Sequence, residues 1–434
     1  MRTRPLMLGV LSVLLVVCAV SLSVTDRPMT VSADTLKAAA PLQWYRGNLH
    51  THSLWSDGDD YLEMIAQWYR DHNYDFLCFT DHNVLANRER WIDVEKTKGG
   101  LKALEKLKAR FPDWTEERTK EGRLEVRLRR FDEVVEKLAI PGKFLLIQGE
   151  EVSDKFEKLP IHLNAHNVRD VIPPRGGDSV YEVIQNNVDS LNAQRERTRQ
   201  PMFIHLNHPN FGWGVAAEDL MRVRGENFFE VYNGHPGVHN DGDEMYASTE
   251  RIWDIVNSMR LTQFDLPLLY GLATDDGHNY HNIPSRASEP GRGWVTVLAA
   301  ELTPASLIEN MEAGRFYSSS GVTLDEITST PGTLSVVVRP DPEATYRIDF
   351  IGTAKGFDPN SEPYRDKGGK KLGITRKYSS EIGAVLKSVE GAKGIYEFSG
   401  KELYVRARIT SSRKHPNPSV PGEFERAWTQ PVRP

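Results

Sequence analysis

Short apolar runs alternate with helix-like segments from residue 45 to about residue 300. Residues 61–70 repeat apolar side chains at helical spacing, with Leu62, Ile65 and Tyr69 on one face. The apolar runs have the length of buried strands and lie at residues 76–79, 144–147, 201–204, 228–233 and 266–272. Such alternation predicts an α/β fold, in which βα units build a parallel sheet or barrel.

Residues 88–140 interrupt this alternation with a segment that is dense in charge. Leu101, Leu104 and Leu107 recur at helical spacing, and Leu124 and Leu128 do so farther along. The spacing predicts a helical insertion folded as a hairpin of two helices. Its charges are mixed in sign, which is typical of a solvated surface.

The pattern changes after about residue 300. Residues 304–313 have the spacing of a last helix, and short strand-like runs follow at residues 334–338, 346–351 and 403–409, the last in clean alternation. Glycine- and lysine-rich loops separate these runs. We therefore expect a first domain over residues 34–320 and a C-terminal antiparallel β-sandwich over residues 321–434, which packs against the first domain as a lid or brace.

The first 33 residues have the features of a targeting segment. Arg2 and Arg4 precede an apolar run over residues 6–24, and Val31-Ser32-Ala33 offers a small-residue cleavage site. This pattern predicts a signal peptide and an exported protein, periplasmic or extracellular. The alternative is an uncleaved membrane anchor, because the run approaches spanning length. Contact with a membrane is expected only through this segment.

Composition narrows the class of protein further. A chain of 434 residues with 39% hydrophobic and 26% charged residues is typical of a globular protein of two domains or of one barrel with an appendage. The formal net charge of −6 gives no basic footprint for nucleic acid. Cys18 lies in the targeting segment, so the cleaved chain would keep Cys78 alone and could form no intrachain disulfide.

Two histidines and an aspartate open the first domain at His50, His52 and Asp57. Residues two apart on a strand point to the same side, so both imidazoles can face one point. Asp57 sits in a Ser-Asp-Gly turn, where a tight bend can return its carboxylate to them. Together the three form a cradle for a metal ion if further ligands arrive.

Further candidates follow the ends of the predicted strands, where catalytic residues gather in parallel α/β folds. The whole set of imidazole and carboxylate groups is His50, His52, Asp57, His82, Glu151, His162, His208, Asp276 and His278. Nitrogen and oxygen ligands without a thiol suit zinc, manganese or iron. Nine groups exceed what one ion can take, so the sequence predicts two or three divalent ions.

The motifs occur in a fixed order: His-x-His with Asp-Gly, Thr-Asp-His, Gly-x-Glu with a following His, His-Pro, and Asp-x-His. In this order they resemble the metal-binding motifs of the PHP (polymerase and histidinol phosphatase) superfamily. Gly314-Arg315-Phe316-Tyr317 and Trp428-Thr429-Gln430-Pro431 further resemble its CehA/McbA-type branch. The resemblance implies a distorted (β/α)7 barrel with a trinuclear centre in its mouth.

The resemblance also implies how the ligands are shared. His50, His52, Glu151 and Asp276 would hold the first metal. Glu151 would bridge to a second metal held with His162 and His208, and Asp57, His82 and His278 would hold the third. The sequence itself leaves Glu150 as an alternative to Glu151 and His205 as an alternative to His208. His166, Asp275 and His281 are expected to support the site at most.

Adjacent divalent ions can hold a hydroxide and stabilise in-line displacement at phosphorus. We therefore expect a hydrolase of phosphate mono- or diesters of small molecules, with His50, Asp57, His82, Glu151 and His278 in the catalytic centre. Arg286, Arg292 and Arg315 are candidates to bind the phosphate. The alternatives are an amide, ester or carbamate hydrolase, as the branch resemblance implies, and an exported metal-binding module without catalysis.

Overall fold

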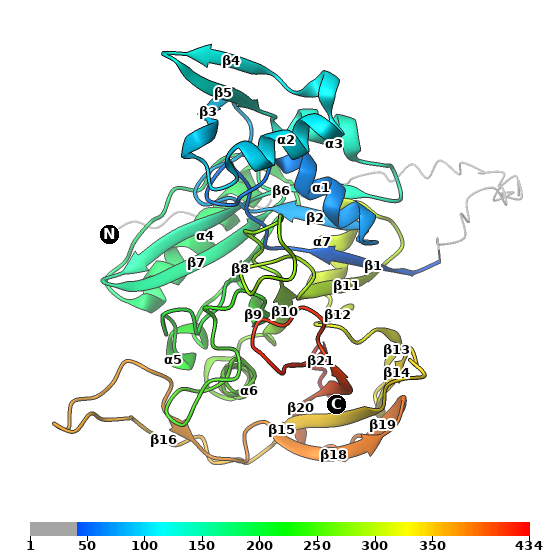
Figure 1. The fold of residues 1–434 in the computed structure, drawn as a ribbon. Coiled ribbons are helices and arrows are strands. Elements are labelled where there is room, and N and C mark those ends of the chain that lie inside the picture. Colours follow the sequence, from blue (N-terminus) through cyan, green and yellow to red (C-terminus); the bar gives the residue numbers. More distant parts are fainter. Residues whose placement is uncertain (1–40) are drawn as a thin grey trace, which may run out of the picture. The chain divides into compact units, whose positions relative to one another are not determined.

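A computed structural model describes residues 41–434 of the chain (Figure 1). The predicted targeting segment, residues 1–33, lies outside the described residues. Within the described part, no helix is both long enough and apolar enough to span a bilayer. The α-helices are α1 (Leu62–Asp71), α2 (Gly100–Arg110), α3 (Phe131–Leu138), α4 (Val180–Thr198), α5 (Ala217–Leu220), α6 (Thr249–Met259) and α7 (Pro304–Glu312).

One large sheet of 13 strands organises this part of the chain. In spatial order its strands are β10 (Tyr270–Thr274), β9 (Phe228–Asn233), β8 (Phe203–Leu206), β7 (Leu159–His166), β6 (Leu145–Phe156), β2 (Phe76–Phe79), β1 (Gln43–Asn48), β11 (Trp294–Ala299), β12 (Phe316–Ser319), β21 (Phe424–Thr429), β20 (Glu402–Lys414), β15 (Tyr346–Ala354) and β18 (Ala384–Glu390). The fold is therefore mixed α/β, as the alternation predicts.

Six strands of this sheet run in the same direction. β1, β2 and β6 are parallel neighbours, and so are β8, β9 and β10. β7 runs against both groups, because only Glu157 and Lys158 separate it from β6 and a crossover to a parallel strand needs a longer connection. The six carboxyl ends therefore meet at one edge of the sheet.

The sheet curves so that its first strand lies beside strands from its middle. The carbonyl oxygen of Gly271 in β10 accepts hydrogen bonds from Ser318 Oγ in β12 at 2.7 Å and from Gln430 Nε2 at 2.9 Å. The six parallel carboxyl ends thus surround a common point. This curvature gathers residues that lie more than 200 positions apart in the sequence.

Helices on the outside of the curve bury the apolar faces of these strands. Val183, Ile184 and Val188 of α4 share a buried cluster with Leu163 of β7 and Ile204 of β8. The helix begins after Ser179, whose side chain accepts a hydrogen bond from the backbone N–H of Glu182 and so caps the first turn. These contacts fix the backs of the strands whose ends carry the site.

The predicted helical hairpin over residues 88–140 is wrong in part. The segment holds α2 and α3, but also a three-stranded antiparallel sheet of β3 (Arg90–Asp93), β4 (Glu117–Lys120) and β5 (Arg123–Leu128). Leu124 and Leu128 also fit the two-residue period of a strand. Glu121 and Gly122 both take positive φ, which gives the tight turn that antiparallel hairpins favour over helices.

The C-terminal strands belong to more than one sheet. β13 (Leu324–Ser329), β14 (Thr333–Val338) and β19 (Lys393–Glu397) make a separate antiparallel sheet, and β16 (Ser361–Glu362) pairs with β17 (Lys377–Tyr378). Val336 of β14 packs in one cluster with Ile348 of β15 and Val405 of β20. β21 pairs with β12 across the boundary predicted at residue 320, so both parts of the chain share one sheet.

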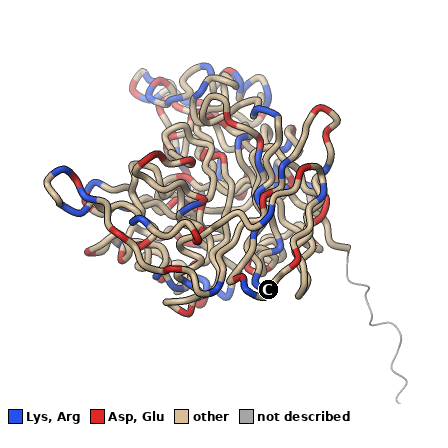
Figure 2. The backbone as a smooth tube through the Cα atoms, turned by 90° about the horizontal axis from the view of Figure 1, so that it is seen from below, with Lys and Arg blue, Asp and Glu red and all other residues tan. Residues whose placement is uncertain are grey.

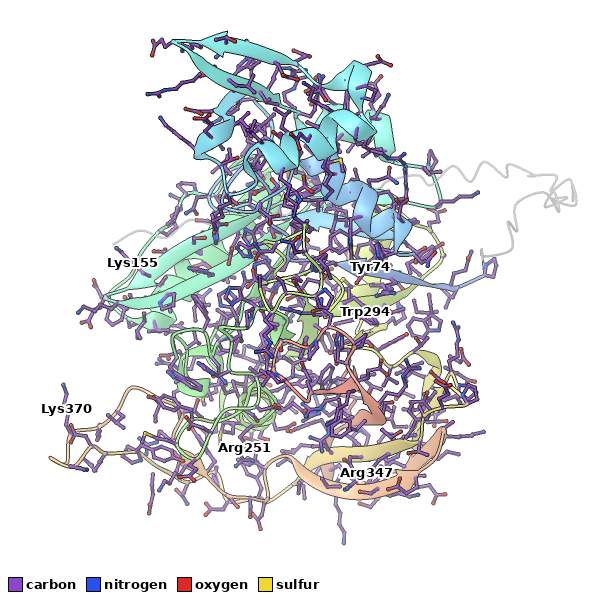
Figure 3. All side chains as sticks on the ribbon, in the orientation of Figure 1. Tyr74, Lys155, Arg251, Trp294, Arg347 and Lys370 are labelled. Atoms are coloured by element: carbon purple, nitrogen blue, oxygen red, sulfur yellow. The ribbon has the colours of Figure 1, made fainter. Side chains whose placement is uncertain are left out.

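Positions of Lys and Arg and of Asp and Glu are interspersed along the backbone (Figure 2). Figure 3 labels Lys155, near the end of the β6–β7 hairpin, and Tyr74 and Trp294, which lie beside each other. The guanidinium of Arg46 stacks on both of these rings, 4.0 Å and 3.7 Å from their centroids. The aromatic rings thereby cover a cation that β1 would otherwise expose.

A buried ion pair joins α6 to β20. Arg406 Nη2 lies 2.7 Å from Asp254 Oδ2 and 3.0 Å from Glu250 Oε2, and the Tyr404 hydroxyl donates to Asp254 Oδ1 at 2.8 Å. The Arg406 side chain is only 1% exposed. A charge so fully removed from water depends on its partners for its stability.

We expect Arg406→Ala to lower the free energy of unfolding by about 3–5 kcal/mol, because it leaves the buried Asp254 carboxylate unpaired. The matched control is Arg197→Ala, whose ion pair with Asp170 is 61% exposed on both sides and should contribute only about 0–1 kcal/mol. Urea-induced unfolding of both variants measures the difference. Equal losses would show that burial does not govern this pair.

Candidate metal centre

The predicted ligands converge at the edge where the six parallel strands end. His50 and His52 follow β1, His82 follows β2, Glu151 lies in β6, and His208 follows β8. Parallel bridges between Thr51 and Gly277 and between His82 and Glu151 align the neighbouring segments. The loop after β10 adds Asp276 and His278, and the adjacent strand β7 adds His162. Asp57 joins His52, His82 and His278, so all nine predicted groups lie in one cluster.

Four of these groups surround a first point. His50 Nε2 lies 3.5 Å from Glu151 Oε2 and 3.3 Å from Asp276 Oδ1. His52 Nε2 lies 3.2 Å and 3.3 Å from the same two oxygens. All four side chains are buried, so this is the innermost part of the cluster.

The two oxygens of Glu151 face different imidazoles. Oε1 lies 3.0 Å from His162 Nδ1 and 3.5 Å from His208 Nε2, whereas Oε2 faces His50 and His52. Burial alone would raise the pKa of the Glu151 carboxyl, but the surrounding imidazoles, that of His82 foremost, hold it well below its usual value. Glu151 is therefore an ionised carboxylate placed to bridge two binding points.

Asp57, His82 and His278 form the outer part of the cluster. Asp57 Oδ1 lies 3.5 Å from His82 Nε2 and 3.3 Å from His278 Nε2. The Asp57 side chain is 42% exposed and that of His82 is 28% exposed, so this part faces solvent. Partial burial opposes ionisation of Asp57, yet the neighbouring imidazoles, that of His278 foremost, lower the pKa of its carboxyl.

Several buried atoms of the cluster have no hydrogen-bond partner within residues 41–434. They are His50 Nε2, His52 Nδ1 and Nε2, Asp57 Oδ1 and Glu151 Oε2. An unsatisfied buried polar atom costs about 1–3 kcal/mol, so a folded chain retains such atoms only where something else satisfies them. Their nitrogen and oxygen chemistry fits divalent cations such as zinc, manganese or iron.

Glu150 and Glu151 point to opposite sides of β6, as strand geometry requires. Glu150 Oε2 accepts a hydrogen bond from the backbone N–H of Ile172 at 2.9 Å, away from the imidazoles. Burial raises the pKa of the Glu150 carboxyl to about 7. The geometry therefore favours Glu151 over Glu150 as the group at the centre.

The sequence does not predict Glu230 as a site residue. It lies in the middle of the predicted strand at residues 228–233. Its Oε1 accepts from His50 Nδ1 at 2.7 Å, and its Oε2 accepts from the backbone N–H of His208 at 2.7 Å. Burial would raise the pKa of this carboxyl, but the adjacent imidazoles, that of His50 foremost, lower it. An ionised Glu230 can only accept, so Nδ1 of His50 is the donor and Nε2 is the nitrogen that faces the cluster.

His205 belongs to a second layer behind the cluster. Its Nε2 lies 3.3 Å from Glu230 Oε1, its Nδ1 lies 3.0 Å from His166 Nε2, and His166 Nδ1 lies 3.1 Å from the Cys78 sulfur. His205 and His166 thus extend a buried chain that ends on Glu230. His208 contacts Glu151 directly, so the geometry favours it over His205. The sequence feature that could have pointed to this layer is Glu230, a single charged residue within an otherwise apolar strand.

The three candidate arginines lie outside the cluster. Arg292 is fully buried, and its guanidinium binds the carbonyl oxygens of Gly234 and Ala287 and the Glu289 carboxylate, so it connects loops. Arg315 is exposed, and its carbonyl oxygen accepts a hydrogen bond from the backbone N–H of Leu298. Leu298 pairs with Trp44 at the start of β1, whereas His50 follows the other end of that strand, so Arg315 lies far from the cluster. Arg286 is exposed on the loop after β10.

Asp275 and His281 do not face the imidazoles. The Asp275 carboxylate accepts hydrogen bonds from Tyr69 Oη at 2.8 Å and from the backbone N–H of Gly293 at 2.8 Å, and so anchors the loop after β10. His281 Nε2 lies 2.9 Å from the carbonyl oxygen of Asp59. Both support the backbone around the site.

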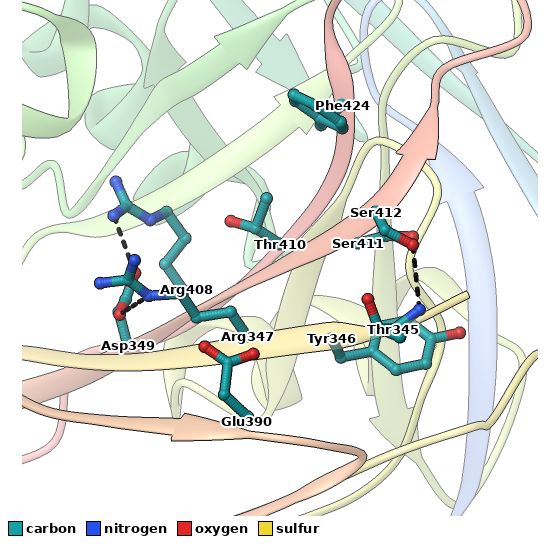
Figure 4. A pocket seen from close by; sticks show the side chains of 10 residues that line it. All are labelled: Thr345, Tyr346, Arg347, Asp349, Glu390, Arg408, Thr410, Ser411, Ser412 and Phe424. Carbon is teal, nitrogen blue, oxygen red and sulfur yellow. Dashed lines mark hydrogen bonds and ion pairs between the residues drawn. The ribbon is translucent and has the colours of Figure 1, made fainter.

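A hollow of about 420 Å³ on the C-terminal strands has different chemistry (Figure 4). Arg347 Nε and Arg408 Nη2 both donate to the Asp349 carboxylate, at 2.8 Å and 3.0 Å, so its cations are paired within the chain. Among the described residues, the clusters of His, Asp and Glu with metal-binding geometry instead lie at the carboxyl ends of the parallel strands or directly behind them, at His205 and Glu230.

No family model and no curated protein matches this chain. Among solved structures, the chain is similar to a two-domain protein from Bacteroides vulgatus that contains a predicted PHP-like metal-dependent phosphoesterase, with 16% identity and a TM-score of 0.37 over 90% of this chain and 95% of that one. It is also similar to a proposed metal-dependent phosphoesterase from Bifidobacterium adolescentis, with 11% identity and a TM-score of 0.27 over 54% of this chain and 87% of that one.

We expect Glu151→Gln to remove more bound metal than Glu150→Gln. The first change removes the charge that faces the imidazoles on both sides of the centre, whereas the second alters a carboxyl that faces Ile172. Elemental analysis after dialysis against manganese or zinc measures both variants. Equal loss, or greater loss from Glu150→Gln, would reverse the assignment.

Proposed function

We propose that this chain is a metal-dependent hydrolase of the PHP type that cleaves phosphate mono- or diesters. The observation that carries the proposal is the set of buried, unpaired nitrogen and oxygen atoms around Glu151. The assignment of three ligand sets, and of the curved strands to a distorted (β/α)7 barrel followed by a β-sandwich domain, is part of the same proposal. It rests on the order of the motifs and on the geometry of the ligands.

Divalent ions bound there would supply Lewis acidity and water activated at neutral pH. The chain's own part is to hold the ligands in fixed geometry. Glu230 fixes the ring of His50, and Asn207 Nδ2 donates to Glu151 Oε1 at 2.8 Å, so neither ligand needs to reorganise. Asp57, His82 and His278 lie at the exposed side, where a substrate enters.

Hydrolysis of the phosphate ester needs water as its one co-reactant. The water oxygen bonds to phosphorus, the bond between phosphorus and the ester oxygen breaks, and the departing alkoxide takes up one proton. Among residues 41–434, Cys78 is the one cysteine, and it is buried behind His166. A thiol intermediate is therefore not part of the proposed reaction.

An amide, ester or carbamate hydrolase of the CehA/McbA type is the second candidate. The observation that favours it is that the three candidate arginines, Arg286, Arg292 and Arg315, all lie outside the cluster. A neutral carbonyl substrate needs no fixed cation. Activated water attacks carbonyl carbon as well as phosphorus.

We expect a chelator to abolish hydrolysis of an aryl phosphate, and manganese or zinc to restore it. His278→Ala should lower kcat/KM by more than about 100-fold, since changes to partners of ligands alone typically cost about 10- to 100-fold. His72→Ala is the matched control, because His72 is exposed and stacks on Trp68 at the end of α1. Turnover by metal-free protein would contradict the proposal.

Parallel assays with carboxylic esters and carbamates separate the two candidates. Hydrolysis of carbamates without hydrolysis of phosphate esters would select the second. Stoichiometric metal binding without any turnover would instead identify a metal-binding module.

We further propose that the protein is exported through its N-terminal segment, because Arg2, Arg4 and the apolar run over residues 6–24 have the pattern of a signal peptide. N-terminal sequencing of the secreted or periplasmic protein should find a start near Asp34. An intact Met1 on a cytoplasmic product would contradict export, and an intact Met1 in the membrane fraction would identify an anchor.

A further inference from the structure

A pocket of about 590 Å³ lies between three loops. One loop follows β9, one follows β10, and the third connects β20 to β21. The residues that line it include Pro236, Pro284, Arg286, Pro416, Pro418 and Pro421. In Figure 1 the connection between β20 and β21, in red, extends from the C-terminal strands toward the strands that carry the site.

Two of these loops are in direct contact with predicted metal ligands. The ring of His235, which precedes Pro236, lies 5.8 Å from the ring of His278. The backbone N–H of His278 donates to the carbonyl oxygen of Ser288 at 2.9 Å, and Ser288 Oγ donates to the carbonyl oxygen of Asp276. Two of the three loops that line the pocket therefore adjoin predicted ligands of the metal centre.

The third loop is fixed to the other two by Arg292. Its guanidinium donates to the carbonyl oxygen of Gly234 at 2.9 Å and to the carbonyl and side-chain oxygens of Asn417 at 3.1 Å each. Tyr232 Oη donates to Glu423 Oε2 at 3.3 Å and adds a second connection. A pocket whose walls are already joined loses little entropy when a ligand binds.

The lining predicts the chemistry of the occupant. Five proline rings offer apolar surface and no N–H donors, so they favour an apolar or aromatic body. Arg286 is exposed and makes no ion pair with any residue in the described part of the chain. A guanidinium beside apolar walls favours an anion such as a carboxylate, which it can bind through two N–H groups.

We propose that this pocket binds the alcohol portion of the substrate and selects aromatic alcohols that carry a carboxylate. The inference rests on the proposed function for the scissile group, which the metal centre binds. The pocket then holds the alcohol portion of the ester, which is released as the free alcohol when water displaces it from phosphorus. Arg286 binds its carboxylate, and the loop between β20 and β21 gives the C-terminal strands a part in specificity.

The test compares para-carboxyphenyl phosphate with phenyl phosphate on the metal-loaded full chain. Arg286→Gln should raise KM for the carboxylate substrate about 10-fold, the worth of one charged hydrogen bond, and leave kcat and the KM for phenyl phosphate unchanged. Arg315→Gln is the matched control, an exposed arginine at the opposite end of the sheet. Equal KM values for both substrates in the wild type, or no effect of Arg286→Gln, would overturn the proposal.

Binding of para-carboxybenzyl phosphonate and benzyl phosphonate, measured by titration calorimetry, separates this inference from the proposed function. Tighter binding of the carboxylate compound that Arg286→Gln removes and Arg315→Gln retains supports the pocket, even if no phosphate ester is hydrolysed. Equal affinity of the two phosphonates overturns the pocket, even if the enzyme hydrolyses phosphate esters.

Discussion

The Glu151 carboxylate, buried among imidazoles, is the interaction on which the site depends. An ionised carboxylate is costly to bury, and this one is compensated by imidazoles that come from four separate strands or loops. In turn, burial would lower the pKa of His50, but the carboxylates of Asp276, Glu230 and Glu151, that of Asp276 foremost, hold it well above its usual value. Protons and metal ions therefore compete for one set of lone pairs, and metal binding must release protons.

That arrangement requires strands that run in one direction and a sheet that curves. The ligands lie on loops and strands rather than in helices, so the backs of the strands remain free to pack against α4 and α6. Behind the ligands, Glu230 and His205 provide a layer of hydrogen bonds that fixes ring orientations. The rigidity of the site thus comes from the core of the sheet and from this buried polar layer together.

Much of the fold class and of the site follows from the sequence, because both rest on local signals. Apolar runs that end in His, Asp or Glu mark strand ends, and parallel strand ends meet in space, so His50, His82, Glu151 and Asp276 could be brought together without coordinates. The choice between Glu150 and Glu151 follows from strand alternation once one of them faces the site.

Other features depend on contacts that no local pattern records. Leu124 and Leu128 fit a helix and a strand equally well, and the turn at Glu121 and Gly122 decides between them. An arginine looks the same in sequence whether it binds a ligand or joins loops, so Arg292 could be placed only by its partners. The sequence did not single out Glu230 because its strand is otherwise apolar, and one glutamate does not change the pattern of apolar residues that predicts a buried strand.

The place of β21 in the sheet also bears on how the protein is made. This strand holds residues Phe424–Thr429, far along the chain from β12 (Phe316–Ser319), yet it pairs with β12 on one side and β20 on the other. Until it is synthesised, β12 is an edge strand with unpaired backbone groups, a template for pairing with other chains. The strands that carry the ligands thus stay open to aggregation until residues 424–429 have been synthesised.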